Sequence, residues 1–271
     1  MADKLVIKNV GIMLSGALEA PILDADTVVC IDGKIADVGR EANVDADGAT
    51  VTVDAKGAAL SPGLIDSHVH PVAGDWTPRQ SQVGWIDSSM HGGVTTMISA
   101  GEAHFPGRPR DPKGVVALAI AAQRSFSAYP GLVKVHAGAP ILEKEMVEED
   151  FKYMAEAGVT LLGEIGLGGV KAGDEAKIMV DWARKYGIQS TIHTGGPSIP
   201  GSGLIDKDIV LEAGADIIGH INGGHTALPL DQIRCLCEDC SAGIEIVHNG
   251  NEKAALYAMR TAFELEQADR V

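Results

Sequence analysis

Two histidines two residues apart, His68 and His70, close an apolar segment and together could hold a metal ion. They end the sequence Pro62-Gly-Leu-Ile-Asp-Ser-His-Val-His70. Side chains two apart on a strand project from the same face, so both imidazoles would face one point. Neutral imidazole is a good ligand for zinc and related divalent ions. The alternative is a chance pair of histidines at a strand end, and the preceding apolar strand favours the metal site over it.

Three more candidate ligands stand at the ends of three later apolar segments. They are Glu164, His193 and His220. Taken singly, each has a structural explanation, such as a histidine bonded to the backbone or a glutamate paired with a neighbouring charge. Four separate segments that end in metal-binding residue types favour a single shared metal centre.

The five candidate ligands are more than one ion needs. A catalytic zinc ion takes three protein ligands and a water, whereas a carboxylate such as Glu164 has two oxygens and can bridge two ions. We therefore expect two divalent ions, Zn²⁺ with Fe²⁺ as the second option, because imidazole suits both. Such a pair makes water a nucleophile near neutral pH and polarises the carbonyl that it attacks.

Candidate substrate contacts lie in loops near the same strand ends. An acidic protein needs local positive charge to hold a carboxylate, and arginine can do so with two hydrogen bonds. Ordinary surface arginines and packed histidines are the alternative. The candidates are His104, His136, Arg79, Arg108 and His225. Arg110 is a third loop cation of the same kind.

Residues 1–60 are expected to form a small β domain, one part of a composite sandwich. Short β-branched runs at Lys4–Asn9, Thr27–Ile31, Lys34–Val38 and Thr50–Val53 are separated by turn residues. Asp32-Gly33, between two of these runs, is a dipeptide that favours a two-residue hairpin turn.

Residues 61–271 alternate between apolar strands and helices, which indicates a parallel sheet covered by helices. Several helices stop at a glycine, such as Gly187 and Gly214, that can adopt the left-handed conformation. The expected strands are Gly63–Val69, Val94–Ser99, Leu132–Val135, Val159–Ile165, Gln189–Ile192, Asp216–Ile221 and Ile244–Val247. The expected helices are Lys113–Phe126, Glu145–Ala157, Asp174–Tyr186, Asp206–Ala213 and Leu230–Cys237.

This α/β pattern fits either an open doubly wound sheet or a (β/α)₈ TIM barrel. Seven strands are counted, and an eighth would only begin at Arg270-Val271. In a barrel the carboxyl ends of all strands meet at one rim, where active sites are built. The barrel is therefore the architecture that would bring the five candidate ligands together.

Composition excludes several classes of function. The chain has 271 residues, 45% of them hydrophobic, with a formal net charge of −15 that makes nucleic acid an unsuitable partner. No apolar stretch is long enough to span a membrane and the first nine residues do not resemble a signal peptide, so we expect a cytoplasmic location. The four cysteines are too few and too clustered for a disulfide framework, and Cys235, Cys237 and Cys240 favour helix packing.

The histidine segment ending at His70, together with the hairpin Asp32-Gly-Lys-Ile-Ala-Asp-Val-Gly39, resembles the amidohydrolase superfamily of metal-dependent (β/α)₈ barrels. Further segments narrow the resemblance to enamidases: His91-Gly-Gly-Val-Thr-Thr, Val133-Lys-Val-His136, His193-Thr-Gly-Gly196 and His220-Ile-Asn-Gly-Gly224. The resemblance implies that His68 and His70 bind one ion, that His193 and His220 bind the other, and that Glu164 lies between them.

The resemblance also implies an activity. It is the hydrolysis of a cyclic amide C–N bond, which opens 6-oxo-1,4,5,6-tetrahydronicotinate and gives 2-formylglutarate and ammonia. The resemblance also implies that the enzyme is a homotetramer. Ring opening as in dihydroorotases or hydantoinases, deamination, and a non-catalytic metal-binding subunit are the alternatives.

One residue of the superfamily pattern is missing from the chain. The superfamily takes a metal-binding, proton-shuttling aspartate from strand eight, and no residue before Val271 can fill that role. We therefore expect a fragment of a longer protein or a natural truncation without catalysis. Alone, a barrel that lacks its last strand would have two unpaired edges, little activity and weak metal binding.

Overall fold

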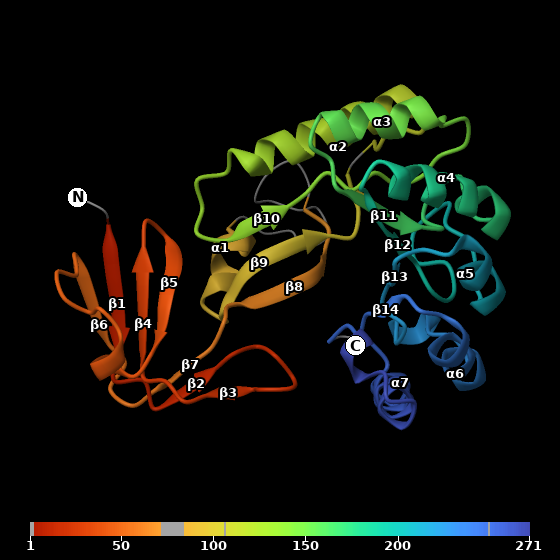
Figure 1. Cartoon of the computed structure of the whole chain (residues 1–271). Coiled ribbons are helices and arrows are strands. Elements are labelled where there is room, and N and C mark those ends of the chain that lie inside the picture. The colour runs from red at the N-terminus through yellow and green to blue at the C-terminus, as the bar shows by residue number, and fades with distance from the viewer. Residues whose placement is uncertain (1–2, 72–83, 106, 249) are drawn as a thin grey trace. The chain divides into compact units, whose positions relative to one another are not determined.

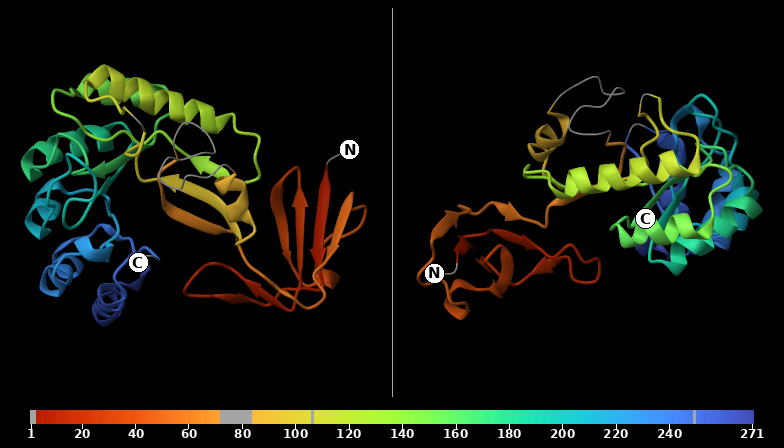
Figure 2. Two further views of the ribbon diagram at one scale, coloured as in Figure 1. Left: turned by 180° about the vertical axis from the view of Figure 1, so that it is seen from behind. Right: turned by 90° about the horizontal axis from the view of Figure 1, so that it is seen from above.

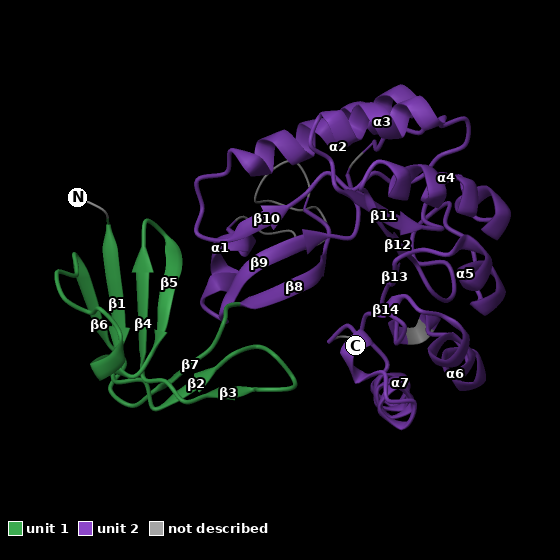
Figure 3. Cartoon of the chain, in the orientation of Figure 1, with its two compact units in different colours: residues 1–63 green, residues 64–271 purple. Residues whose placement is uncertain are grey.

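The computed structural model describes residues 3–71, 84–105, 107–248 and 250–271. The chain divides into two compact units, Met1–Gly63 and Leu64–Val271, coloured separately in Figure 3.

The first unit contains two small sheets within its described residues. One has the strand order β5-β4-β1-β6 and the other the order β3-β2-β7. The expected hairpin is confirmed: β4 and β5 pair antiparallel around Asp32 and Gly33, which both have positive φ angles, as this turn requires. A small core of Val10, Met13, Ala25 and Val28 lies between the strands. The elements are β1 (Lys4–Lys8), β2 (Ile12–Leu14), β3 (Ile22–Leu23), β4 (Thr27–Ile31), β5 (Lys34–Gly39), η1 (Glu41–Asn43), β6 (Val51–Asp54) and β7 (Ala59–Leu60).

The second unit alternates parallel strands with helices, and Figures 1 and 2 show helices α2 to α7 along the outer side of the strands. The strands are β8 (Leu64–Val69), β9 (Val94–Ser99), β10 (Lys134–His136), β11 (Leu161–Ile165), β12 (Gln189–Ile192), β13 (Ile217–Ile218) and β14 (Gly243–Ile244). The helices are α1 (Trp85–Met90), α2 (Pro112–Ser127), α3 (Glu148–Glu156), α4 (Gly173–Lys185), α5 (Lys207–Ala213), α6 (Leu230–Asp239) and α7 (Glu252–Glu264), with short 3₁₀ turns η2 (Gly224–Thr226) and η3 (Ala268–Arg270).

The predicted α/β class with parallel strands is confirmed. Among the described residues, hydrogen-bonded strands form two sheets, in the orders β10-β9-β8 and β11-β12-β13-β14. The two sheets approach each other between β11 and the segment after β9. There the backbone N–H of Glu164 donates a hydrogen bond to the carbonyl of Ala100 at 2.7 Å. Glycine makes this approach possible, since a Cβ on Gly163 would lie 2.7 Å from the Cα of Gly101.

Two predicted strands are reduced to two residues each in the structure. The segment Asp216–Ile221 pairs only at Ile217–Ile218, because the chain turns at His220, whose φ is +33°. The segment Ile244–Val247 pairs only up to Ile244. Beyond it the side-chain amide of Asn222 binds both the backbone N–H and the carbonyl of Val247, at 2.9 Å each, in place of a neighbouring strand.

Two helices, α1 and α7, add to the five predicted ones. Helix α7 buries Ala254, Ala258 and Ala262, whose small side chains leave only a weak hydrophobic pattern in the sequence. The predicted helix ends at Gly187 and Gly214 are confirmed by their left-handed φ angles of +74° and +63°. In the described part of the chain, none of the helices has the length and apolar character needed to cross a bilayer.

Candidate metal centre

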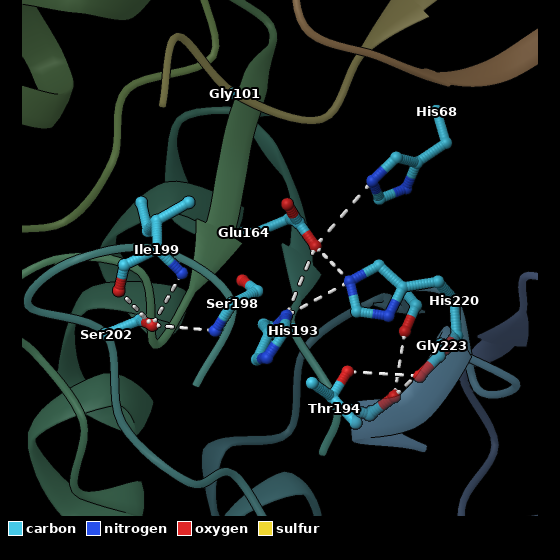
Figure 4. A network of polar contacts seen from close by, with 12 residues as sticks. His68, Gly101, Glu164, His193, Thr194, Ser198, Ile199, Ser202, His220 and Gly223 are labelled. Atoms are coloured by element: carbon cyan, nitrogen blue, oxygen red, sulfur yellow. Dashed lines mark hydrogen bonds and ion pairs between the residues drawn. The ribbon is translucent and has the colours of Figure 1, made fainter. Parts of the chain in front are cut away.

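The five candidate ligands lie at the carboxyl ends of four strands and converge on one point. His68 belongs to β8 and His70 follows it, Glu164 belongs to β11, His193 directly follows β12, and His220 follows β13. The side chains of His70, Glu164 and His193 are buried, and those of His68 and His220 are only 12% and 13% exposed. Figure 4 shows His68, His193 and His220 pointing toward the carboxylate of Glu164.

Glu164 is the centre of this cluster. Its Oε1 lies 2.6 Å from Nε2 of His220, 3.6 Å from Nδ1 of His193 and 3.7 Å from Nε2 of His68. Its Oε2 lies 3.4 Å from Nε2 of His70. Two sets of three possible ligands result, and they share Glu164: one with His68 and His70, the other with His193 and His220.

In three of the histidines, the ring nitrogen that points away from Glu164, called here the far nitrogen, lies close to an oxygen atom. Nδ1 of His70 lies 2.8 Å from the carbonyl of Gly101, and Nε2 of His193 lies 2.9 Å from the carbonyl of Gly196. Nδ1 of His68 lies 2.5 Å from a carboxylate oxygen of Glu245. Because these oxygens can accept a hydrogen, the far nitrogen of a neutral imidazole would carry it, and the inner nitrogen would be left to bind an ion. This is the arrangement that a metal-binding imidazole needs.

Without a bound ion, the surrounding histidines compensate the buried charge of Glu164. Burial alone would raise the pKa of Glu164, but hydrogen bonds from His193, His220 and His68 hold it well below its usual value. Burial would likewise lower the pKa of His68, but Glu164 and Glu245 outweigh it and raise that pKa to about 10. Burial lowers the pKa of His70 to about 4. An ionised carboxylate is thus enclosed by imidazoles, and this donor set fits two divalent ions.

Comparison with known proteins supports one family. No family model matches the chain. Enamidase of Eubacterium barkeri is 47% identical over 270 residues, which are 99% of this chain and 70% of that protein. The chain belongs to the enamidase family. The crystal structure of enamidase, described as a new member of the amidohydrolase superfamily, matches 99% of the chain with a TM-score of 0.94 and 47% identity, and 70% of that structure is covered.

More distant matches agree with the amidohydrolase fold of enamidase. A dihydroorotase of Pediococcus pentosaceus is 26% identical over 77% of this chain and 46% of its own length. A β-aspartyl dipeptidase from Fervidobacterium islandicum aligns with the whole chain and 72% of its own, with a TM-score of 0.65 at 18% identity, which shows the fold alone. The predicted resemblance to the amidohydrolase superfamily, and within it to enamidase, is confirmed.

The histidine candidates for substrate contact in this enamidase homologue belong to different segments of the chain. The ring of His104 stands edge-on to that of His70, with 4.8 Å between ring centres. His136 ends β10 and is half-buried, and burial lowers its pKa, with a smaller contribution from Lys134. His225 belongs to the turn η2, five residues after His220.

The arginine candidates differ in what they contact. Arg79 lies outside the described residues. Arg108 is committed to an ion pair, because its Nη1 lies 3.0 Å from Oε1 of Glu143 and its side chain is only 5% exposed. Arg110 binds the same oxygen at 2.9 Å but is 52% exposed. Contact of any of these residues with a substrate stays a prediction.

Two buried carboxylates that contact candidate residues escaped the sequence reasoning. Glu143 is hydrogen-bonded by Arg108, Arg110 and the backbone N–H of Gly169. Glu245 directly follows β14 and contacts His68. An acidic residue within an otherwise apolar strand was the available signal for Glu245, as it was for Glu164.

Proposed function

We propose that this chain carries an enamidase-like activity, the hydrolytic opening of a cyclic amide at a centre of two divalent ions. The observation that carries the proposal is Glu164, an ionised and buried carboxylate shared by two pairs of histidines. Identity of 47% to enamidase over nearly the whole chain supports the same reaction class.

His68 and His70 would hold one ion, His193 and His220 the other, and Glu164 both. Bound divalent ions supply Lewis acidity, which polarises an amide carbonyl and makes water a nucleophile at neutral pH. The protein's own contribution is orientation. The carbonyls of Gly101 and Gly196 hold the rings of His70 and His193 and so orient their inner nitrogens toward Glu164.

As substrate we propose 6-oxo-1,4,5,6-tetrahydronicotinate. Water adds to the ring carbonyl, the C–N bond breaks and the nitrogen leaves as an enamine. A second water then converts the enamine to an aldehyde and releases ammonia, which gives 2-formylglutarate. For the carboxylate of such a substrate we propose Arg110, which is half-exposed although it also pairs with Glu143. Zinc or iron as the metal, a homotetramer and a cytoplasmic location stay predictions.

The test compares two cyclic amides. The protein is stripped with a chelator, reloaded with Zn²⁺ or Fe²⁺, and assayed for ammonia release and loss of the lactam. We expect the lactam to be opened only after reloading, dihydroorotate to be left intact, and Glu164→Gln to be inactive. Opening of dihydroorotate without the lactam would refute the assignment, and inactivity of the loaded protein on both amides would refute the proposed reaction class.

A further inference from the structure

Glu245 is a buried carboxylate whose position is fixed by the backbone on both sides. It directly follows β14, and its side chain is 8% exposed. Its backbone N–H donates to the carbonyl of Ile218 at 3.0 Å, and its carbonyl accepts from the N–H of Ile221 at 2.9 Å. These bonds hold the backbone of Glu245 against the segment that carries His220.

The carboxylate contacts the β8 ligand segment at two points. Oε1 accepts from the hydroxyl of Ser67 at 2.7 Å, and Oε2 lies 2.5 Å from Nδ1 of His68. With the hydrogen on Nδ1, Nε2 of His68 is left as the donor atom that faces Glu164. His70 and His193 receive the same support from backbone carbonyls, so His68 is the one among these three whose far nitrogen depends on a side chain.

The same carboxylate also supports the segment of the second pair of histidines. Oε2 of Glu245 accepts from the backbone N–H of His220 at 3.3 Å. His220 has a φ of +33°, an unfavourable conformation for a residue with a side chain, and it persists where surrounding contacts hold it. Glu245 supplies one of these contacts, and the carbonyl of His220 receives others from Gly223 and Thr194.

We propose that Glu245 is a positioning residue for both halves of the metal centre: it orients the imidazole of His68 and holds the backbone of His220. This inference rests on the proposed function, because it presupposes that the cluster binds metal. An anionic acceptor behind an imidazole fixes the ring and increases its basicity, so the contact strengthens the metal ligand as well as orienting it.

The experiment measures metal binding directly, without turnover. Metal-free full-length protein is titrated with Co²⁺, and the dissociation constants and visible absorption spectrum are recorded for the wild type, Glu245→Ala, Glu245→Gln and Ser67→Ala. The alanine variant removes all contacts of the carboxylate. The glutamine variant keeps its shape and an acceptor for His68 but removes the charge. Ser67→Ala is the matched control, because it removes one partner of Glu245 and leaves both histidine contacts.

We expect Glu245→Ala to weaken Co²⁺ binding by about 10- to 100-fold and to change the spectrum, Glu245→Gln to weaken it by less than about 10-fold, and Ser67→Ala by less than about threefold. If Glu245→Ala does not fold, Glu245→Gln tests the inference: its Co²⁺ spectrum should differ from that of the wild type and its Co²⁺ binding should be weaker. Wild-type affinity and spectrum in the Glu245 variants would overturn the inference alone, and so would equal weakening by Ser67→Ala. A wild type that binds no Co²⁺ would overturn the proposed function, and this inference with it.

Discussion

Glu102 is a buried acid whose ionisation should cost the protein stability. It lies in the loop after β9 and is 1% exposed. One oxygen accepts from the backbone N–H of Gly138 at 3.3 Å, while the other is buried without a hydrogen-bond partner among the described residues. Arg108 lines the same small cavity, but its guanidinium is paired with Glu143. Burial therefore raises the pKa of Glu102 from 4.5 to about 8, against smaller effects of Gly138 and Ser99.

The sign of the effect follows from proton linkage. Between pH 4.5 and 8 the unfolded chain has lost the proton of Glu102 while the folded protein retains it, so stability falls as pH rises. Each pH unit in this window costs about 1.4 kcal/mol. Linkage with these two pKa values gives a cost of about 0.8 kcal/mol at pH 5 and about 3.3 kcal/mol at pH 7. The difference between the two pH values is about 2.5 kcal/mol.

Glu102→Gln removes the ionisation and keeps the shape of the side chain. We expect its free energy of unfolding in urea, relative to the wild type, to improve by about 2.5 kcal/mol between pH 5 and pH 7. Glu149→Gln is the control, because it makes the same chemical change on a side chain of α3 that is 78% exposed. Parallel pH profiles for Glu102→Gln and the wild type would refute the reasoning, since they would mean that Glu102 ionises in the folded protein as readily as in water.

Two further predictions concern ion pairs. Arg108→Met should lower the free energy of unfolding by about 3 kcal/mol, because it leaves the buried charge of Glu143 with one cation fewer. Arg110→Met removes an exposed partner of the same oxygen and should cost less than about 1 kcal/mol. Equal losses of the two variants in urea unfolding would contradict this. For Asp216, burial would raise the pKa, but Arg184 and Ser190 lower it below its usual value. Asp216→Asn should therefore destabilise the protein by about 1 kcal/mol at pH 7. This difference from the wild type should shrink as the pH falls below about 4, because the wild-type carboxylate becomes protonated. A difference that stays constant as the pH falls would contradict the prediction.

The residues of the metal centre could be predicted because strand geometry is local. The spacing of His68 and His70 is enough to place both on one face, and an apolar run before Glu164 or His193 marks a strand end. The convergence of the ends then follows from the parallel topology.

What supports these residues could not be predicted, because it depends on contacts between distant parts of the chain. Glu245 contacts His68 across 177 positions, and nothing near Glu245 in the sequence indicates which strand lies beside it. Similarly, Arg108 is a loop cation by sequence, and only the fold reveals that Glu143 binds it. The turn at His220 also escaped prediction, because tertiary contacts stabilise a φ that its residue type disfavours.

The carbonyls that hold His70 and His193 both belong to glycines, but the two glycine positions differ in their tolerance of substitution. A side chain at Gly101 would meet Ile141 at 2.4 Å, and its φ of +138° suits glycine alone, so any replacement there would displace the support of His70. At Gly196 the nearest atom would be 3.7 Å away, an ordinary contact. The position that supports His70 is thus tied to a single permitted amino acid, whereas position 196, which supports His193, can accept a side chain without a clash.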